Sequence, residues 1–294
     1  MQVLVAGATG MLGSEICRRL IARGHGVAGL VRASAEPERV AALRDAGVEL
    51  REGDLTDAAS LPPALAGVDA VISTVTAIHQ RTPEQSLDQV DRAGQRALIE
   101  AAAAAGVQRF VYLSFSGRLG REDALARGKR ASEEALRASG LAHTILRPTY
   151  FMEVWLSPRL GFDHPNARAT VYGSGQPPIS WISFRDVAEF AARTVDDPGA
   201  EGATLELGGP EALSPLKVVH IFEQESGRKF EVQHVPEAAL EAQYRAAEQP
   251  LPRAFAALTL SYVGGDAIPM AETAAKYGVR LRSVRDYARD ALVR

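Results

Sequence analysis

Short apolar runs and amphipathic stretches alternate along the first half of this chain. The runs are rich in Val, Leu and Ile and lack a regular polar alternation, which is typical of strands buried on both faces of a sheet. They predict strands at residues 3–8, 27–31, 48–55, 68–75, 107–115 and 143–148. The stretches between them predict a helix after residue 11, helices at 36–46, 57–66 and 87–105, and another that begins near Lys129.

This alternation with short connections predicts a Rossmann-type doubly wound α/β fold, in which helices cover both faces of a parallel sheet. After Tyr150, Pro and Gly become frequent. That part predicts short strands at 181–184 and 203–209, and helices at 185–195, 214–226, 236–247 and near the C-terminus. We expect residues 1–150 to form the main domain. Residues 151–294 are expected to form a smaller lobe that is interleaved with it rather than independent.

The composition is that of an ordinary globular protein, since 46% of the 294 residues are hydrophobic and 23% are charged. The formal net charge, 33 − 36 = −3, does not favour a nucleic-acid partner, which a basic face would indicate. Cys17 is the single cysteine, and the histidines lack metal-ligand spacing. No leader pattern and no long apolar run occur. We expect a cytoplasmic monomer or homodimer that binds a small-molecule substrate, with no metal, nucleic acid or membrane.

The first strand runs into GATGMLG, a GxxGxxG pattern that opens a helix. One glycine allows a tight turn, another lets the backbone approach a pyrophosphate, and the last allows the helix to pack closely on the sheet. The helix N-terminus adds free N–H groups and a partial positive charge. The pattern predicts a dinucleotide cofactor; the alternative is a glycine-rich turn that binds nothing. The predicted contacts are Gly7, Thr9, Gly10, Met11, Leu12 and Gly13.

The end of the second strand indicates which dinucleotide to expect. An acidic residue there would bind the ribose 2′-hydroxyl of NAD, but residues 27–35 contain no acid and instead carry Arg32 and Ser34. A guanidinium can bind a 2′-phosphate through two hydrogen bonds and stack on adenine. We therefore expect NADP(H) rather than NAD(H). The alternative for Arg32 is a solvated loop residue.

Two further strand ends are candidates for cofactor contacts, because ligands approach the carboxyl edge of an open parallel sheet. Asp54 and Leu55 end the third strand. Asp54 could accept a hydrogen bond from the adenine amino group, or it could cap the next helix. The fourth strand ends with Ser73, Thr74 and Val75.

These motifs resemble those of the atypical short-chain dehydrogenase/reductases, and within them the NmrA-like NAD(P)-binding group. The resemblance rests on GATGMLG, on VR after the second strand, on GDL after the third and on RFVYLSF in the fifth. It continues through KRASEEALRASGLAHTILRPTYFME, ISWISFRDVAEFAARTVDDP and LELGGPEALS, and covers most of residues 1–230. It implies the fold and the cofactor but leaves the reaction open. The group contains quinone reductases, isoflavone-type and phenylcoumaran-type reductases, and dinucleotide-sensing regulators without turnover.

The wider superfamily uses a serine, a tyrosine, and a lysine four residues after the tyrosine. The resemblance places the serine at Ser114 and the lysine at Lys129, whereas the tyrosine position holds Leu125, which cannot transfer a proton. Alcohol–ketone interconversion by that triad is therefore not expected. Lys129 has three interpretations. It anchors the nicotinamide ribose, it acts as a general acid/base with a pKa lowered by desolvation, or it is a surface residue paired with Glu133.

Another group could replace the proton of the missing tyrosine. Tyr150 follows the sixth strand, near the expected nicotinamide end, and aromatic packing is its alternative role. His79, in the loop after the fourth strand, is a second candidate or a plain loop residue. Ser116 and Tyr112 share strand parity with Ser114, although Tyr112 is expected in the core.

Apolar side chains of the smaller lobe are expected to form a wall that suits an aromatic, apolar acceptor. Core packing is their alternative role, and residues 255–262 could form a lid. The candidates are Phe151, Met152, Trp155, Phe162 and Trp181.

Three functions remain open. The first is an NADPH-dependent reductase that transfers hydride to a quinone-like or conjugated aromatic small molecule. The second is a non-catalytic NAD(P)-sensing regulatory protein of the NmrA type. The third is an isomerase or epimerase that keeps its cofactor bound, and the missing tyrosine counts against it. The retained Lys129 favours the reductase.

Overall fold

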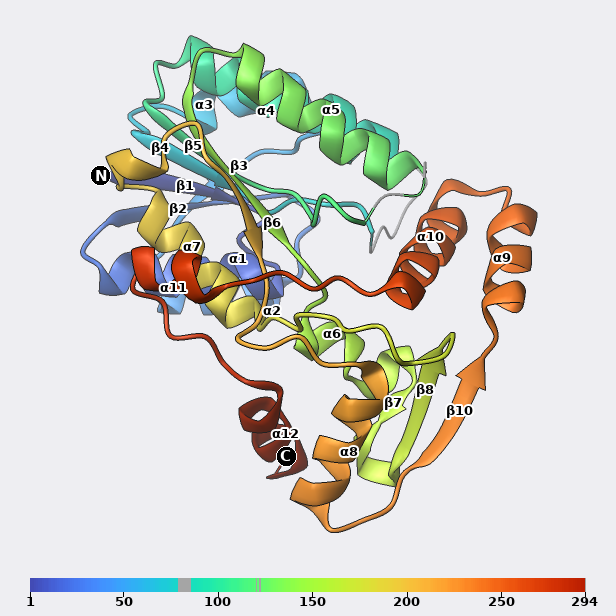
Figure 1. Cartoon of the computed structure of the whole chain (residues 1–294). Helices are drawn as coiled ribbons and strands as arrows, with labels where there is room; N and C mark the ends of the chain where they lie inside the picture. The colour runs from blue at the N-terminus through green and yellow to red at the C-terminus, as the bar shows by residue number, and fades with distance from the viewer. Residues whose placement is uncertain (79–85, 120, 122, 294) are drawn as a thin grey trace. The chain divides into compact units, whose positions relative to one another are not determined.

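The computed structural model describes residues 1–78, 86–119, 121 and 123–293 (Figure 1). The chain divides into two compact units, each assembled from three segments of the sequence. The first unit contains Met1–Ser114, Arg127–Leu146 and Val187–Leu205. The second unit contains Phe115–Ala126, Arg147–Asp186 and Glu206–Arg294.

A seven-stranded sheet runs through the first unit in the order β3-β2-β1-β4-β5-β6-β9. Its strands are β1 (Gln2–Ala6), β2 (Gly26–Val31), β3 (Glu49–Glu52), β4 (Ala70–Ser73), β5 (Arg109–Leu113), β6 (Ala142–Pro148) and β9 (Thr204–Leu207). The first six strands pair in parallel wherever they are neighbours. The strand order reverses between β1 and β4. Open α/β sheets bind ligands at such a switch point, beyond the carboxyl ends of the strands.

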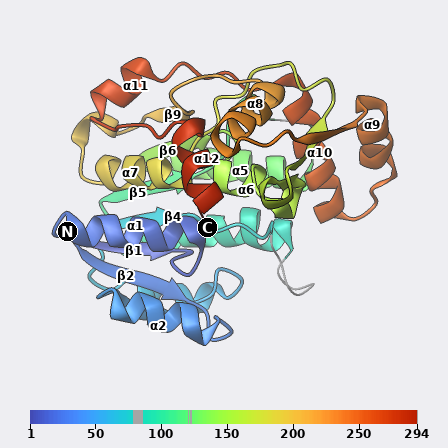
Figure 2. The same ribbon diagram turned by 90° about the horizontal axis from the view of Figure 1, so that it is seen from below.

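Helices cover both faces of this sheet, with α4 and α5 on one face and α1 and α7 on the other (Figure 1). α1 and α7 lie side by side (Figure 2), and an ion pair joins Arg19 of α1 to Glu189 of α7. The helical elements are α1 (Met11–Ala22), α2 (Pro37–Asp45), η1 (Ala58–Ser60), α3 (Leu61–Ala64), η2 (Asp88–Gly94), α4 (Gln95–Ala104), α5 (Ala124–Ala138), α7 (Phe184–Thr194) and η5 (Pro198–Ala200).

The core of the first unit explains why these segments form these elements. Leu4, Val71 and Phe110 come from three neighbouring strands and are fully buried, as expected for strands covered on both faces. Leu98 on α4 packs into the same cluster. Cys17 lies on the buried side of α1, and burial raises the pKa of its thiol to about 12.

The second unit contains a three-stranded sheet in the order β10-β8-β7 and a set of helices. The strands are β7 (Phe162–Asp163), β8 (Arg168–Tyr172) and β10 (Glu231–Val235). The helical elements are α6 (Met152–Trp155), η3 (Pro158–Leu160), η4 (His164–Asn166), α8 (Pro215–Ser226), α9 (Glu237–Ala246), α10 (Pro250–Gly264), α11 (Ala271–Lys276) and α12 (Val284–Val293). None of the helices in the described ranges combines the length and apolar character needed to cross a lipid bilayer.

The Rossmann-type fold predicted from the sequence is confirmed, and all six strands expected before Tyr150 are present. The strand expected at 181–184 is wrong. Ile182 forms an isolated bridge with Phe151, and α7 already begins at Phe184. Trp181 is fully buried in the core of the second unit. Burial in that core, not membership of a sheet, therefore explains this apolar run.

Candidate functional site

The turn between β1 and α1 has the geometry that its glycines predict. Gly7 has a φ of +86°, a left-handed conformation that favours glycine, and a Cβ there would lie 2.5 Å from Oγ1 of Thr74. A Cβ on Gly13 would lie 2.1 Å from the carbonyl oxygen of Gly7. The first turn of α1 therefore packs directly on the end of β1. Only glycine allows this approach at either position.

The N-terminus of α1 has its first N–H groups available for a ligand. Gly10 is the N-cap residue, and no side chain caps the helix there. The first turn contains no acidic residue that would neutralise the positive end of the helix dipole. Met11 is 41% exposed, Leu12 is partly buried, and Thr9 places its carbonyl oxygen 3.3 Å from Nη1 of Arg39.

Arg32 and Ser34 lie in an exposed turn directly after β2, in which the N–H of Ala35 donates to the carbonyl of Arg32. Arg39 on α2 is also exposed and reaches the glycine-rich turn through its contact with Thr9. The guanidinium of Arg32 is thus exposed near the predicted position of the 2′-phosphate, and that of Arg39 lies close by but forms an ion pair with Glu36. Sequence reasoning missed Arg39. The signal was an arginine near the start of the helix that follows Arg32.

The residues that end β3 serve the local turn. Oδ1 of Asp54 accepts hydrogen bonds from the N–H and the hydroxyl of Thr56, at 2.9 and 2.8 Å. Asp57, not Asp54, caps the helical turn η1 by accepting from the N–H of Ala59. Leu55 is buried in the core of the first unit. The carboxylate of Asp54 thus already has local donors, whereas a contact between Asp54 and adenine remains a prediction.

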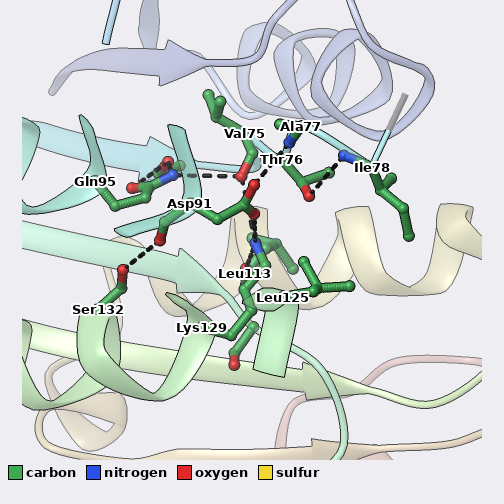
Figure 3. Close-up of polar contacts among 12 residues, drawn as sticks. Val75, Thr76, Ala77, Ile78, Asp91, Gln95, Leu113, Leu125, Lys129 and Ser132 are labelled. Atoms are coloured by element: carbon green, nitrogen blue, oxygen red, sulfur yellow. Dashed lines mark hydrogen bonds and ion pairs between the residues drawn. The ribbon is translucent and has the colours of Figure 1, made fainter. Parts of the chain in front are cut away.

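The end of β4 lies next to the glycine-rich turn. The hydroxyl of Ser73 is fully buried and exchanges hydrogen bonds with the side chain of Gln95. Thr74 donates from its hydroxyl to the carbonyl of Ala6, at 3.2 Å. Ser73 and Thr74 thus tie β4 to its neighbours. The carbonyl of Val75 points into the polar cluster drawn in Figure 3.

Lys129 is at the centre of that cluster and is only 5% exposed (Figure 3). Its Nζ lies 3.3 Å from the carbonyl oxygen of Val75, 3.2 Å from that of Leu113 and 3.4 Å from Oδ1 of Asp91. The side chain also lies over the ring of Tyr112, with Nζ 5.3 Å from the ring centroid. Lys129 is thus not a surface residue, and Asp91 is its ion-pair partner in the described chain.

The surroundings of Lys129 keep it positively charged. Burial acts to lower the pKa of Lys129, but Tyr112 and Asp91 together outweigh burial and raise this pKa above its usual value. Burial also raises the pKa of Tyr112, so its hydroxyl stays protonated at neutral pH. The negative charge beside Lys129 is therefore the carboxylate of Asp91. The raised pKa does not support the lowering that desolvation alone would cause, and an acid/base role of Lys129 stays a prediction.

Ser114 is turned towards α5. Its hydroxyl donates to Oε1 of Glu133 at 2.6 Å and accepts from Nη1 of Arg130 at 3.2 Å. Glu133 also forms ion pairs with Arg130 and Arg137. A catalytic role of Ser114 would require its hydroxyl to exchange these partners. The pairing of Lys129 with Glu133 that the spacing suggested is replaced by pairing with Asp91.

The position of the missing tyrosine is an aliphatic one in the first turn of α5. Leu125 is 4% exposed, and its N–H donates to Oδ1 of Asp123 at 2.7 Å. Asp123 accepts from Ala126 as well and so caps the start of α5. The fold therefore keeps the helix that carries Lys129 but offers no proton donor one turn before it.

Tyr150 lies in the aromatic core of the second unit. It is 2% exposed, and its hydroxyl donates to the carbonyl of Leu258 at 3.1 Å. Its ring contacts Trp155, Trp181 and Tyr262. This environment favours the packing role that the sequence left open. His79, the other candidate donor, lies outside the described residues.

The apolar wall candidates belong to the same unit but differ in exposure. Phe162, Met152 and Trp181 are buried in its core. Trp155 is partly buried and stacks on Phe255 of α10, with ring centroids 6.3 Å apart and planes 3° apart. Phe255 is 39% exposed. It lies on a regular helix, α10, which includes the segment that could form a lid. Phe151 is partly buried at the start of α6.

Comparison with known proteins places the chain in a family. Its residues 1–258 match the model of the NmrA-like family. Photosystem II assembly factor Ycf39 of Synechocystis sp. is 32% identical over 246 residues, which cover 82% of this chain and 72% of the relative. The (4-alkanoyl-5-oxo-2,5-dihydrofuran-3-yl)methyl phosphate reductase of Streptomyces griseus is 36% identical over 215 residues, covering 72% of this chain and 69% of the relative.

A solved structure supports the fold over the full length. The NADPH-dependent quinone oxidoreductase QOR2 of Escherichia coli, complexed with NADPH, matches with a TM-score of 0.78 and 24% identity. The match covers 99% of this chain and 100% of that protein. At this identity the likeness shows the fold alone. The family match over residues 1–258 and the two relatives above 30% identity establish that this chain belongs to the NmrA-like family.

Proposed function

We propose that this chain is an NADPH-dependent reductase that transfers hydride to a quinone-like or conjugated aromatic small molecule. The observation that carries the proposal is Lys129. It is a buried cation at the carboxyl edge of the sheet, beside the ends of β4 and β5, in a helix without the usual tyrosine. The QOR2 and Streptomyces proteins, both named for reductions, support it.

The glycine-rich turn and the N-terminus of α1 fit a dinucleotide pyrophosphate. A Cβ at Gly7 or Gly13 would collide with the turn or the end of β4, and the uncapped first turn of α1 offers N–H donors to an anion. The exposed Arg32 and Ser34, with Arg39 close by, suit a 2′-phosphate. These residues would hold NADP(H), which supplies the hydride when bound.

Lys129 would donate to the hydroxyls of the nicotinamide ribose and so orient the ring. As a cation it also favours negative charge that develops near it during hydride transfer. Without a tyrosine at position 125, the chain offers no proton donor at that place. A conjugated acceptor suits this arrangement, because a quinone that takes up hydride becomes a hydroquinone anion stable enough to take its proton from water. The unsaturated acyl-lactone in the name of the Streptomyces relative is likewise a conjugated acceptor.

The partly exposed stack of Trp155 and Phe255 supports an aromatic substrate, since flat aromatic rings pack well on such a surface. Both residues belong to the second unit. Their contact with the substrate is part of the proposal.

The test is to mix the purified protein with NADPH and a panel of quinones and other conjugated acceptors, and to follow the absorbance of the reduced nicotinamide. We expect acceptor-dependent oxidation of NADPH, and we expect Lys129→Met to lower kcat/KM by about 100-fold, the loss typical of one charged transition-state contact. An acceptor-dependent rate that Lys129→Met leaves unchanged would remove Lys129 from the mechanism.

A second candidate function is a non-catalytic NAD(P)-sensing protein. The relative named as a photosystem II assembly factor favours it, as does the aliphatic residue at position 125. In that case NADPH binds to the purified protein, but no acceptor in the panel is reduced. The same experiment therefore distinguishes the two functions.

A further inference from the structure

Asp91 is a fully buried carboxylate on the helical segment that faces Lys129, and the described residues around it fix its position. Its Oδ2 accepts a hydrogen bond from the N–H of Ala77 at 2.8 Å. The hydroxyl of Ser132 donates to its backbone carbonyl at 2.8 Å, which ties η2 to α5. Oδ1 remains directed at Lys129 (Figure 3).

The local fold brings Asp91 and Lys129 together. η2 (Asp88–Gly94) is a π-helical segment that precedes the regular helix α4, and π-helical turns often occur at functional sites. Both Asp91 and Gln95 are buried there. A Cβ on Gly128 would lie 3.2 Å from Cβ of Asp91, so α5 packs closely against η2 at the residue before Lys129.

The ammonium of Lys129 has three N–H donors, and three protein oxygens lie 3.2 to 3.4 Å from it. These distances exceed the roughly 2.7–2.9 Å of a strong charge-assisted hydrogen bond. Of the three acceptors only Asp91 is charged. The titratable groups that face Lys129 in the described chain are Asp91 on η2 and Tyr112 on β5.

We propose that Asp91 is a positioning residue that keeps Lys129 cationic and directed to the place of the nicotinamide ribose. The inference rests on the proposed function. A ribose hydroxyl would replace one of the two carbonyl contacts of Lys129, while the ion pair with Asp91 persists. Lys129 therefore binds the cofactor as a charged group over the whole physiological pH range.

The test compares Asp91→Asn with the wild-type protein and with Asp88→Asn. Asp88 is a matched control, because it lies on the same segment, is exposed and pairs with Arg92 instead. In Asp91→Asn, one of the two groups that offset burial is lost, so the pKa of Lys129 falls relative to wild type. NADPH affinity of Asp91→Asn, measured by calorimetry, should then fall with rising pH. Relative to wild type, the loss should reach about 10- to 100-fold near pH 9, the range for a lost contact to a charged group.

Thermal melts without NADPH supply a second readout that does not depend on cofactor binding. A buried lysine with a lowered pKa destabilises the fold most at low pH, at which it is charged. The gap in Tm between wild type and Asp91→Asn should therefore narrow as pH rises. Lys129→Met/Asp91→Asn contains neither titratable group, so the Tm of Asp91→Asn should approach that of this double variant as pH rises. The double variant also replaces a buried pair by neutral groups, which is often tolerated.

The two measurements can overturn the inference in two ways. If Asp91→Asn and Asp88→Asn share the wild-type pH profile in both measurements, Asp91 does not hold the charge of Lys129, and the inference is overturned. The inference is also overturned if Asp91→Asn and the double variant both fail to fold, because Asp91 then supports the fold independently of Lys129. If wild type binds no NADPH, the proposed function fails, while the melts still decide whether Asp91 keeps Lys129 charged.

Discussion

Asp266 is a second buried carboxyl group, and its setting differs from that of Asp91. It is 1% exposed in the second unit, and burial raises its pKa above the usual value. The hydroxyls of Thr149 and Ser116 and the charge of Arg118 act in the opposite direction without cancelling this effect. Within the described ranges, Asp266 forms no ion pair like the one between Asp91 and Lys129.

The raised pKa gives a pH dependence of stability with a definite sign. A carboxyl whose pKa is higher in the folded than in the unfolded protein contributes its full stability below the unfolded value, and this contribution is lost as pH rises. Asp266→Asn keeps the shape and remains neutral. The Tm of Asp266→Asn should therefore increase relative to the Tm of wild type as pH rises from about 4 to 7.

Thermal melts of both proteins across that range check this prediction. Glu248→Gln serves as a control, because Glu248 is exposed. A Tm difference between Asp266→Asn and wild type that stays constant with pH would show that Asp266 is charged in the folded protein at no cost.

At the scale of single elements, the turn from β1 into α1 depends on glycine for close packing. Gly13→Ala should lower the free energy of unfolding by about 1–3 kcal/mol, as overpacking does, because its Cβ would lie 2.1 Å from the carbonyl oxygen of Gly7. It should also weaken NADPH binding, since the first turn of α1 must move. Denaturant unfolding and NADPH titration measure the two effects.

Gly264→Ala is the matched control for that substitution. A Cβ on Gly264 meets nothing within 4 Å, and the residue ends α10. Its replacement should leave both quantities near the wild-type values. Equal losses of stability and NADPH affinity in the two variants would mean that the lack of space for a Cβ at Gly13 is not the cause.

The sequence predicts those elements whose physical cause is local. The glycine pattern and the apolar runs determine β1, the following turn and the parallel sheet, because burial on both faces leaves a direct trace in the residues. The strand expected at 181–184 fails because Trp181 is buried by tertiary packing instead. The sequence alone does not predict β8 (Arg168–Tyr172). This strand alternates between buried and less buried residues, but over too few residues to give a clear pattern.

The residues of the candidate site likewise fall into those that local motifs reveal and those that depend on contacts distant in the sequence. Lys129, Arg32 and the glycines could be found from local motifs. Asp91 could not, because its importance arises from a contact 38 residues away in the sequence, across two helices (129 − 91 = 38). The side chain of Asp91 points inward from the π-helical segment η2. Residues 87–105 predict a plain helix and give no sign of this π-helical geometry. Ser73 and Leu55 were named for their place at strand ends, and the structure shows both side chains packed inside.

For the molecule as a whole, a cofactor that binds only the folded protein must raise its stability. We expect NADPH to raise Tm, with a gain of about 2.7 kcal/mol at a concentration 100 times its Kd. NADH should give a smaller shift at the same concentration, because it lacks the 2′-phosphate that Arg32 is predicted to bind. In Arg32→Ala the difference between the shifts with NADPH and with NADH should become smaller.

Differential scanning calorimetry of wild type and Arg32→Ala with each cofactor provides the measurement. Arg44→Ala, on the last turn of α2, is a control for the loss of one positive charge nearby. Arg32 would not read the phosphate if its removal reduced the NADPH and NADH shifts by the same amount.

The buried thiol of Cys17 has a consequence for the proposed reduction of quinones, which are electrophilic molecules. Quinones form covalent adducts with cysteine, and the thiolate is the reactive form. Cys17 is the single cysteine, it is fully buried, and its pKa of about 12 keeps it protonated at neutral pH. The folded chain therefore presents no thiol for such adducts. The proposed turnover of quinones would therefore proceed without this form of self-inactivation.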